Sequence, residues 1–416
     1  MATIDTSVPA VILKFVADPY AHGRLGAIRS LGRLGVPVYH LEEVPRTPVS
    51  RTRYGSRIAW DMELDPGRGT FERLWRLGDE LGNRPVLVTT DDLGALFVDE
   101  YADELAEVFR FPRQPRGLAT QLADKADLFQ LCLDTGIPTP RCTIPRSRYD
   151  VEQYIDESLG FPVVIKSADP RLLRQRPQAT SVVIADTPDE LLDIYDTMED
   201  FSAPNLMMQE FIPGGPETVW MFNGYFDAQS ECLFASCGRK LRQRPPDTGP
   251  TTLGKCEAND EVEHVTRRFM KELGYSGIVD MGYRFDARDG TYKLLDVNPR
   301  MGATFRLFTD REGMDVVRAM YLDLTGQAVP AADPALGRKW LVEPLDLWSA
   351  RSSIAAGRLS WGAWIRSLRG VDECAWLARD DLRPFGAMAA AFLADSTRSI
   401  RRRSPLRRSG DDSSPT

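Results

Sequence analysis

The sequence predicts an α/β protein, and three observations support this class. Short apolar stretches with strand character alternate along the chain with longer amphipathic stretches of helical length. Hydrophobic residues make up 43% of the 416 residues and charged residues 27%, a balance that allows a substantial core. A chain of this length is expected to form two to four domains or subdomains.

The first domain is predicted over residues 1–115, as a small open α/β domain of the Rossmann-like kind. It opens with a strand, a helix that stops at Gly35 and a second strand, which together form a βαβ unit. The predicted elements are a strand at 8–16, a helix at 27–34, a strand at 36–39, a strand at 85–89 and a helical stretch to about residue 109.

Gly23 and Gly26 fall in the loop predicted between the first strand and the first helix. Such glycines invite a nucleotide-binding interpretation, but the full dinucleotide-binding fingerprint is absent. Glycines that close a strand-to-helix turn are the preferred explanation.

The second domain is predicted over residues 116–326, and its division into two lobes with a hinge near residues 210–216 is implied by the family resemblance that the motifs below carry. It ends with a hairpin around Asp289-Gly290, since that dipeptide favours a tight turn between two apolar strands. Its predicted helices are 124–135, 188–199 and 261–273, and its predicted strands are 161–166, 206–212, 219–222, 231–236, 278–285 and 292–297.

Two further segments follow. Residues 327–397 predict a mainly helical C-terminal extension that contains five tryptophans. Residues 398–416 combine six arginines with serines and predict a disordered tail, because this composition cannot bury enough apolar surface to fold. The arginines could still make a weak contact with an anionic surface.

Bulk composition excludes several classes of function. A pI near 5.2 argues against nucleic-acid binding. Six scattered cysteines without a Cys-x-x-Cys pair, and only three distant histidines, disfavour a disulfide framework, a zinc site or a Ser-His-Asp triad. Asp5 and Lys14 flank the first apolar run, so no signal peptide is expected, and no stretch is long enough for a membrane span. A cytoplasmic protein is therefore expected; a homodimer is left open.

The most informative motif is the segment 292–300, whose last residues read Asp-Val-Asn-Pro-Arg. Alternation along a strand puts Asp296 and Asn298 on one face, and Asp280 on the preceding strand can lie beside them. Carboxylate and amide oxygens suit a hard cation such as Mg²⁺. Arg300 follows directly after Pro299, which ends the strand. The bland alternative is a strand end with a solvated aspartate.

Three other motifs precede this one. Lys125 opens a helix, and Lys166 ends a strand of four apolar residues, where a lysine is less often accidental than on a surface. The third is the segment Met-Gln-Glu-Phe-Ile-Pro-Gly-Gly-Pro-Glu, which includes Glu210, Phe211, Ile212 and Glu217.

In this order, the four motifs resemble the ATP-grasp superfamily over roughly residues 8–325, and residues 1–115 look like its pre-ATP-grasp domain. The resemblance implies ATP and Mg²⁺, for which Mn²⁺ could substitute, as cofactors. Lys125 and Lys166 would contact the α- and β-phosphates as point charges. Residues 210–212 would bind the adenine edge, and Glu217 the ribose hydroxyls. The resemblance also implies that Asp280, Asp296 and Asn298 hold the metal.

Arg300 would stabilise an acyl phosphate and the tetrahedral intermediate that follows it, because stabilising developing charge is often the largest catalytic contribution. The stretch from Gly238 to Arg244 is basic, and Lys240 or Arg242 could contact the γ-phosphate or a substrate carboxylate. A solvated strand face is an equal alternative.

One position and one loop depart from the superfamily's usual pattern. Position 296 is Asp where Glu is usual, so the carboxylate is one methylene shorter. The loop after Lys166 lacks the usual glycines, and Arg171, Arg174 and Arg176 could replace main-chain amides or face solvent.

The implied activity is ATP-dependent ligation of a small-molecule carboxylate to an amine through an acyl phosphate. Within the superfamily the sequence looks most like predicted carboxylate–amine ligases, a group that includes D-aspartate ligase-like proteins. One alternative is a carboxylase or carbamoyl-phosphate-type enzyme that acts through carboxyphosphate. Another is a non-catalytic ATP-binding regulatory module.

Overall fold

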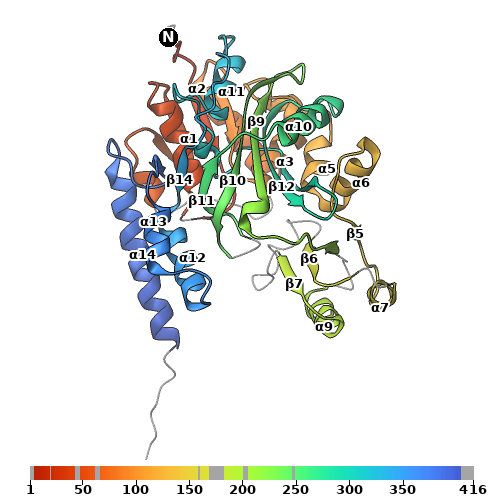
Figure 1. The fold of residues 1–416 in the computed structure, drawn as a ribbon. Helices are drawn as coiled ribbons and strands as arrows, with labels where there is room; N and C mark the ends of the chain where they lie inside the picture. The colour runs from red at the N-terminus through yellow and green to blue at the C-terminus, as the bar shows by residue number, and fades with distance from the viewer. Residues whose placement is uncertain are drawn as a thin grey trace, which may run out of the picture.

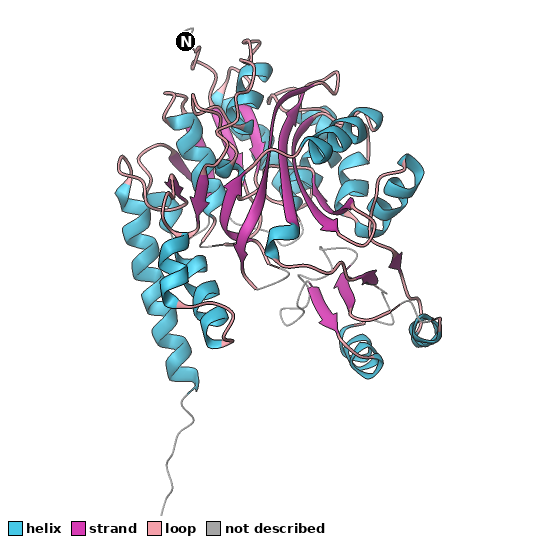
Figure 2. Cartoon of the chain, in the orientation of Figure 1, coloured by secondary structure: helices cyan, strands magenta, loops and turns pink. Residues whose placement is uncertain are grey.

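The computed structural model describes residues 4–18, 20–42, 47–60, 66–157, 160–167, 182–199, 205–245 and 249–403. It is a mixed α/β structure with three sheets (Figures 1 and 2). The strand orders are β3-β2-β1-β4, β13-β12-β9-β10-β11-β14-β15 and β5-β8-β6-β7.

The N-terminal sheet is parallel throughout, as the βαβ opening predicts. Its strands are β1 (Ala10–Leu13), β2 (Val38–Glu42), β3 (Ser56–Ala59) and β4 (Val86–Thr89), and its helices are α1 (His22–Gly32), α2 (Arg68–Leu81), α3 (Asp92–Glu100) and α4 (Ala102–Leu105).

Helix α1 begins five residues before its predicted start, so the prediction that Gly23 and Gly26 close a strand-to-helix turn is wrong. Both glycines lie inside the helix and permit close packing. A Cβ at Gly23 would lie 2.8 Å from the Cα of Ala303, and one at Gly26 would lie 3.0 Å from the ring of Phe305. Helix α1 is thereby held directly against the segment that follows Arg300.

The central sheet has seven strands. Neighbouring strands run antiparallel, except for the last pair, β14 and β15, which run parallel. Alternate residues of β9 (Val219–Phe226) face two different cores: Met221 packs with α1 and α11, whereas Phe222 packs with α5, α6 and α10. The other elements are β10 (Cys232–Gln243), β11 (Thr251–Cys256), β12 (Gly277–Asp286), β13 (Thr291–Asn298), β14 (Lys339–Leu341), β15 (Glu373–Cys374), α5 (Leu118–Ala123), α6 (Lys125–Thr135), α10 (Asp260–Glu272) and α11 (Val316–Leu324).

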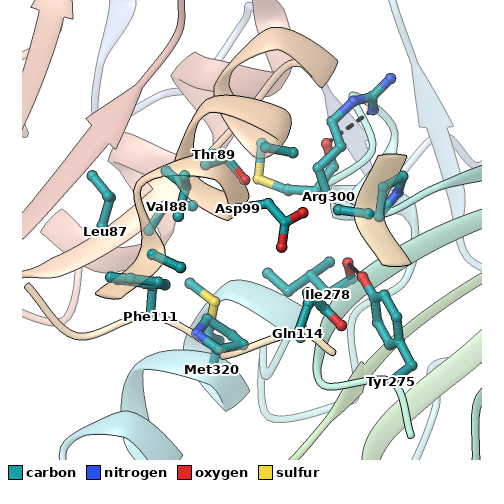
Figure 3. A pocket seen from close by; sticks show the side chains of 18 residues that line it. Leu87, Val88, Thr89, Asp99, Phe111, Gln114, Tyr275, Ile278, Arg300 and Met320 are labelled. Atoms are coloured by element: carbon teal, nitrogen blue, oxygen red, sulfur yellow. Dashed lines mark hydrogen bonds between the residues drawn. The ribbon is translucent and has the colours of Figure 1, made fainter. Parts of the chain in front are cut away.

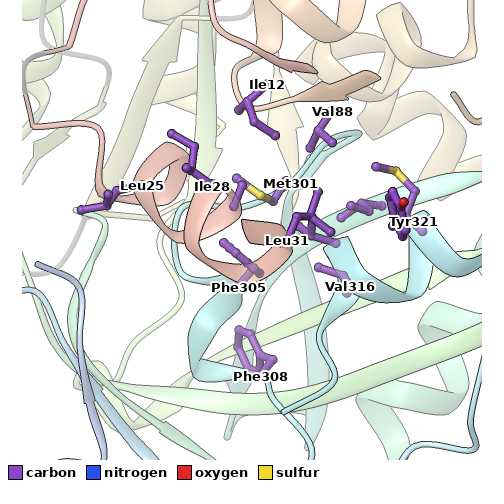
Figure 4. Packing of buried hydrophobic residues seen from close by; sticks show 14 of the residues in the cluster. Ile12, Leu25, Ile28, Leu31, Val88, Met301, Phe305, Phe308, Val316 and Tyr321 are labelled. Carbon is purple, nitrogen blue, oxygen red and sulfur yellow. The ribbon is translucent and has the colours of Figure 1, made fainter. Parts of the chain in front are cut away.

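One hydrophobic core joins the N-terminal domain to the central sheet. Ile12, Ile28 and Val88 of the N-terminal domain pack with Phe305 and Tyr321 (Figure 4). These two parts are therefore fixed to each other by buried apolar contacts.

A smaller lobe carries the third sheet and has its own core, separate from the other clusters (Figure 2). Its strands are β5 (Cys142–Thr143), β6 (Val163–Ser167), β7 (Val182–Ala185) and β8 (Leu206–Glu210), and its helices are α7 (Arg148–Asp156) and α9 (Pro188–Met198). The chain passes from β8 to β9 through residues 211–218, which include the short helix η2 (Pro216–Thr218).

The C-terminal extension is mainly helical, but it also adds β14 and β15 to the edge of the central sheet. Its helices are α12 (Glu343–Ala355), α13 (Trp361–Ser367) and α14 (Leu382–Arg403). Helix α14 continues through the first six residues of the predicted tail, since alanine and arginine are strong helix formers. Residues 404–416 lie outside the described residues. Within the described part of the chain, no helix combines the length and apolarity needed to cross a membrane.

Candidate active site

A cleft of about 400 Å³ lies between the smaller lobe and the central sheet. It receives side chains from β6 and β8 on one side and from β9, β10, β12 and β13 on the other. Among the residues that line it are Lys125, Lys166, Glu210, Phe211, Ile212, Lys240, Asp280, Asp296, Asn298 and Arg300. Ten of the eleven side chains predicted from the sequence thus meet in one place; the eleventh, Glu217, does not line the cleft.

The hairpin of β12 and β13 presents the three predicted metal ligands. Asp280 pairs directly with Asn298, and Asp296 pairs with Gly282, so alternation brings all three side chains to one face. Asn298 Nδ2 lies 3.4 Å from Asp280 Oδ2. Burial raises the pKa of Asp280, although Arg300 opposes the shift. A carboxylate held in such a place favours a cation nearby.

Lys125 reaches across from the first turn of α6 to this hairpin. Its Nζ lies 2.9 Å from Asp296 Oδ1. Although burial works against the ionised carboxylate, Lys125 lowers the pKa of Asp296 to about 2. Burial would lower the pKa of Lys125, but Asp296 raises it above the usual value. Both groups are therefore charged at neutral pH.

Lys166, at the end of β6, has a different environment. Burial lowers the pKa of its ammonium to about 8, and the nearby positive charge of Lys125 adds to this shift. Among the described residues, Lys166 has no ion pair. The predicted contacts of Arg171, Arg174 and Arg176 fall outside the described residues.

Arg300 connects the cleft to the N-terminal domain. Its Nε lies 2.7 Å from Asp92 Oδ1, and its Nη2 donates to Asn298 Oδ1 at 3.1 Å. A second cavity, of about 60 Å³, lies on the other side of Arg300 between α3, β4 and the start of β12 (Figure 3). Burial disfavours the arginine's charge, but Asp92 more than compensates and raises the pKa of Arg300.

Asp92 was not predicted, although the sequence contained a signal for it. Asp91 and Asp92 follow β4 directly. Asp91 caps α3 by accepting from the main-chain N–H of Gly94 at 2.9 Å. The cap accounts for one aspartate and leaves the second available for another role.

The segment after β8 forms the wall at which adenine was predicted to bind. Ile212 is buried, and Phe211 packs against the guanidinium of Arg284. The Glu210 carboxylate is engaged by Arg288 at 2.7 Å. Glu217 is exposed, its Oε1 accepts from the main-chain N–H of Gly215 at 3.1 Å, and it is not among the residues that line the cleft.

Lys240 and Arg242 face different sides of β10. Regular alternation would put them together, but the pairing with β11 is irregular between them, so an extra residue reverses the direction. Lys240 lines the cleft and donates to Gly249 O at 3.1 Å; burial lowers the pKa of its ammonium. Arg242 instead binds Asp346 of the C-terminal extension.

The hairpin residues have a donor set that fits Mg²⁺: two carboxylates and one amide oxygen on a single face. Asp280 supports the fit, because this half-buried carboxylate has no ion pair among the described residues. Gly302 leaves it room, since a Cβ at that position would collide with the Asp280 carboxylate. No cluster of three or more His, Cys, Asp or Glu is found in the described ranges.

Comparison with known proteins adds similarities of sequence and of fold. Residues 122–217 match the model of a RimK-like ATP-grasp domain. This segment is therefore similar to an ATP-grasp domain. It is 25% identical over 285 residues to a D-aspartate ligase of Enterococcus faecium (strain Aus0004), a match that covers 64% of this chain and 66% of the relative. The match thus spans just under two thirds of that relative.

Several solved structures have a similar fold. An L-amino acid ligase from Bacillus licheniformis has a TM-score of 0.57 at 16% identity, covering 76% of this chain and 74% of that one. N5-carboxyaminoimidazole synthetase from Staphylococcus aureus has a TM-score of 0.59 at 12% identity, covering 81% and 82%. Some neighbours were solved with nucleotides, including a synthase from Aspergillus clavatus with ADP. At these identities the similarity concerns the fold.

Proposed function

We propose that this protein is an ATP-dependent carboxylate–amine ligase that forms an amide through an acyl phosphate. The observation that carries the proposal is the arrangement of Lys125, Lys166 and Arg300 around the Asp280–Asn298 face in one cleft. Three cations and a metal-binding face are what a polyphosphate and a developing acyl phosphate require.

The nucleotide is proposed to lie along the cleft from the Glu210–Ile212 wall to the hairpin. The apolar side of this wall would receive adenine, and main-chain groups of residues 210–212 would recognise its edge. Lys166 and Lys125 would then contact the phosphates. Asp280, Asp296 and Asn298 would hold Mg²⁺, which supplies neutralisation of phosphate charge when bound. Glu217 is not part of this proposal in the conformation described, because it does not line the cleft.

The reaction balances with ATP as the only activating reagent. A carboxylate oxygen of the substrate attacks the γ-phosphorus, and the P–O bond to the β-phosphate breaks to release ADP. The amine nitrogen then attacks the carbonyl carbon of the acyl phosphate. The tetrahedral oxyanion collapses, phosphate leaves, and the nitrogen loses a proton to give the amide.

The protein's part in these steps is to hold the reactants and balance their charge. Arg300, fixed by Asp92 at 2.7 Å, is proposed to contact the acyl phosphate and the oxyanion. Lys240, which lines the same cleft, is proposed to contact the γ-phosphate. Both cations are in place before substrate arrives, so little reorganisation is needed during the reaction.

The choice of an amine as acceptor rests on the sequence relative, which is named as a D-aspartate ligase. The similar structures alone would leave a carboxylase open, because one of them is a biotin carboxylase domain with MgADP and bicarbonate. The proposed substrates are accordingly a small carboxylate and an amine such as an amino acid. A cytoplasmic location and a homodimer remain predictions.

The experiment that tests the proposal is an ADP-release screen with Mg²⁺–ATP, pairs of amino acids and small acids, and mass detection of the product. We expect ADP release that requires both an acid and an amine, with an amide of the summed mass minus water. Release that depends on bicarbonate alone would support the carboxyphosphate alternative. ATP binding without release for any pair would favour a regulatory module.

A further inference from the structure

The C-terminal extension is hydrogen-bonded to β10, the strand that carries Lys240. The contact is made by Arg242, two residues after that lysine. Arg242 of β10 donates to both oxygens of Asp346 on α12, from Nε at 2.8 Å and from Nη2 at 3.0 Å. The Asp346 side chain is only 1% exposed. A two-point contact of this kind fixes distance and orientation together.

Asp346 is also bound from two other directions. Thr252 of β11 donates to it at 3.0 Å, and Trp364 Nε1 of α13 donates at 2.9 Å. Ser367, also of α13, accepts from Arg242 Nη1 at 2.9 Å. The network therefore joins both strands of the β10–β11 hairpin to two helices of the extension.

A separate contact holds the next residue of β10. Ser349 of α12 donates to the main-chain oxygen of Gln243 at 2.7 Å, and Gln243 itself lines the cleft. The extension thus holds the main chain on the far side of the irregularity that turns Lys240 toward the cleft.

We propose that the Arg242–Asp346 pair is a positioning device that fixes the irregular segment of β10 and thereby aims the Lys240 ammonium at the transferred phosphoryl group. This inference rests on the proposed function for the role of Lys240. It gives the extension a part in catalysis without contact with substrate. An unfixed bulge would let the ammonium move, and small misplacements of a charged group are costly to turnover.

The test compares Asp346→Asn with a matched control, Asp381→Asn. Asp381 is also 1% exposed and also fastens the extension, through Arg29 Nε at 3.0 Å, but it contacts the N-terminal domain rather than β10. Both variants should lower the melting temperature. Only Asp346→Asn should lower kcat, by about tenfold or more, with the KM for ATP changed by less than about threefold.

A double-mutant cycle with Lys240→Ala identifies the route of the effect. If Asp346 acts through Lys240, then Asp346→Asn should lower kcat by less than about twofold once Lys240 has been removed. Equal reductions of kcat in both backgrounds would overturn the inference. If Asp346→Asn does not fold, Trp364→Phe is the milder variant, since it removes a single donor to Asp346.

A second readout keeps the inference testable without any ligase activity. The rate of acylation of Lys240 by a lysine-selective reagent, followed by mass spectrometry, should change by about threefold or more in Asp346→Asn, because a released ammonium gains access to the reagent while its pKa returns toward the ordinary value. It should be unchanged in Asp381→Asn. If the substrate screen fails but this labelling difference is present, the proposed function alone is rejected. If Lys240 is labelled at the same rate in Asp346→Asn and in the wild-type protein, the positioning role is rejected.

Discussion

Two charged side chains on the hairpin side of the cleft, Asp296 and Arg300, form ion pairs with other elements, whereas Lys166 on the smaller-lobe side has no ion pair among the described residues. Asp296 is paired with Lys125 at 2.9 Å, and Arg300 with Asp92 at 2.7 Å. Lys166 has no ion pair in the part of the chain that the structure describes, and burial lowers its pKa to about 8.

The difference separates two ways of preparing a site for an anion. On the hairpin side, ion pairs hold Asp296 and Arg300 in place before substrate binds. Charged groups fixed in this way stabilise charge that develops during a reaction. On the other side, partial burial disfavours the charged form of Lys166, which has no ion pair among the described residues, and a bound phosphate would favour that charged form. We therefore expect the hairpin side to act mainly on turnover and the Lys166 side mainly on nucleotide affinity.

Removal of Arg300 should give the largest effect. Arg300→Ala is expected to lower kcat by about 10²–10³ with little change in the KM for ATP, because its contact is made mainly in the transition state. Steady-state ADP release over a range of ATP concentrations measures both quantities. Asp92→Asn is the control, since it keeps Arg300 but removes the charge of its ion-pair partner. It should lower kcat by less than Arg300→Ala does. A raised KM with normal kcat would assign Arg300 to the nucleotide site instead.

Loss of Asn298 should come next. Asn298→Ala is expected to leave the fold intact and reduce turnover by about 10², since it removes one of three oxygen ligands on the hairpin face. The Mg²⁺ concentration for half-maximal rate should also rise. Asn298→Asp keeps an oxygen ligand and should retain more activity. Turnover like that of the wild type in the alanine variant would exclude Asn298 from the metal site.

Lys166 should show the contrasting behaviour. Lys166→Met is expected to weaken ATP binding by about tenfold in calorimetry, while the melting temperature without ATP stays normal or rises, because an unpaired buried charge is removed. A similar affinity in the variant would take Lys166 out of the site and remove the contrast between the two sides.

The pKa of Lys166 adds a pH dependence to this prediction. The ammonium is charged below about pH 8 and loses its proton above it. ATP affinity should therefore be greatest below pH 8 and fall as the pH rises through that value, since bound phosphate favours the charged form. Lys166→Arg stays charged over this range and should remove the dependence. The same decline in the arginine variant would point to another group.

The same comparison shows what the sequence could and could not predict. The Asp280–Asn298 face was predictable, because alternation and a short hairpin are local properties. The partners were not: Lys125 and Asp296 are 171 residues apart, and Arg300 and Asp92 are 208 apart. Such pairs depend on how elements that are distant in the sequence pack together, which no local pattern records.

Other differences have equally physical causes. Strands β14 and β15 have three and two residues, too few for a period-two pattern to be recognised, so the extension was predicted without its strands. The bulge in β10 separated Lys240 from Arg242, which alternation alone would have kept on one face. Glu217 was predicted in the site by its motif; in the described structure it accepts a local hydrogen bond from Gly215 N and does not line the cleft.

Removal of residues 404–416 should have the smallest effect of all. The residues that line the cleft in the described structure lie between Lys125 and Thr304, and none of the described residues after Thr304 is among them. The composition of this segment gives it little apolar surface to bury. A chain ending at Arg403, which preserves α14 in full, should keep kcat, the KM for ATP and the melting temperature of the full chain. A large loss of kcat would mean that the tail reaches the hairpin side of the cleft, and a raised KM alone would mean that it reaches the Lys166 side. Either result would show that the tail contributes to one side of the site. Comparing kcat with the KM for ATP would identify whether it is the hairpin side or the Lys166 side.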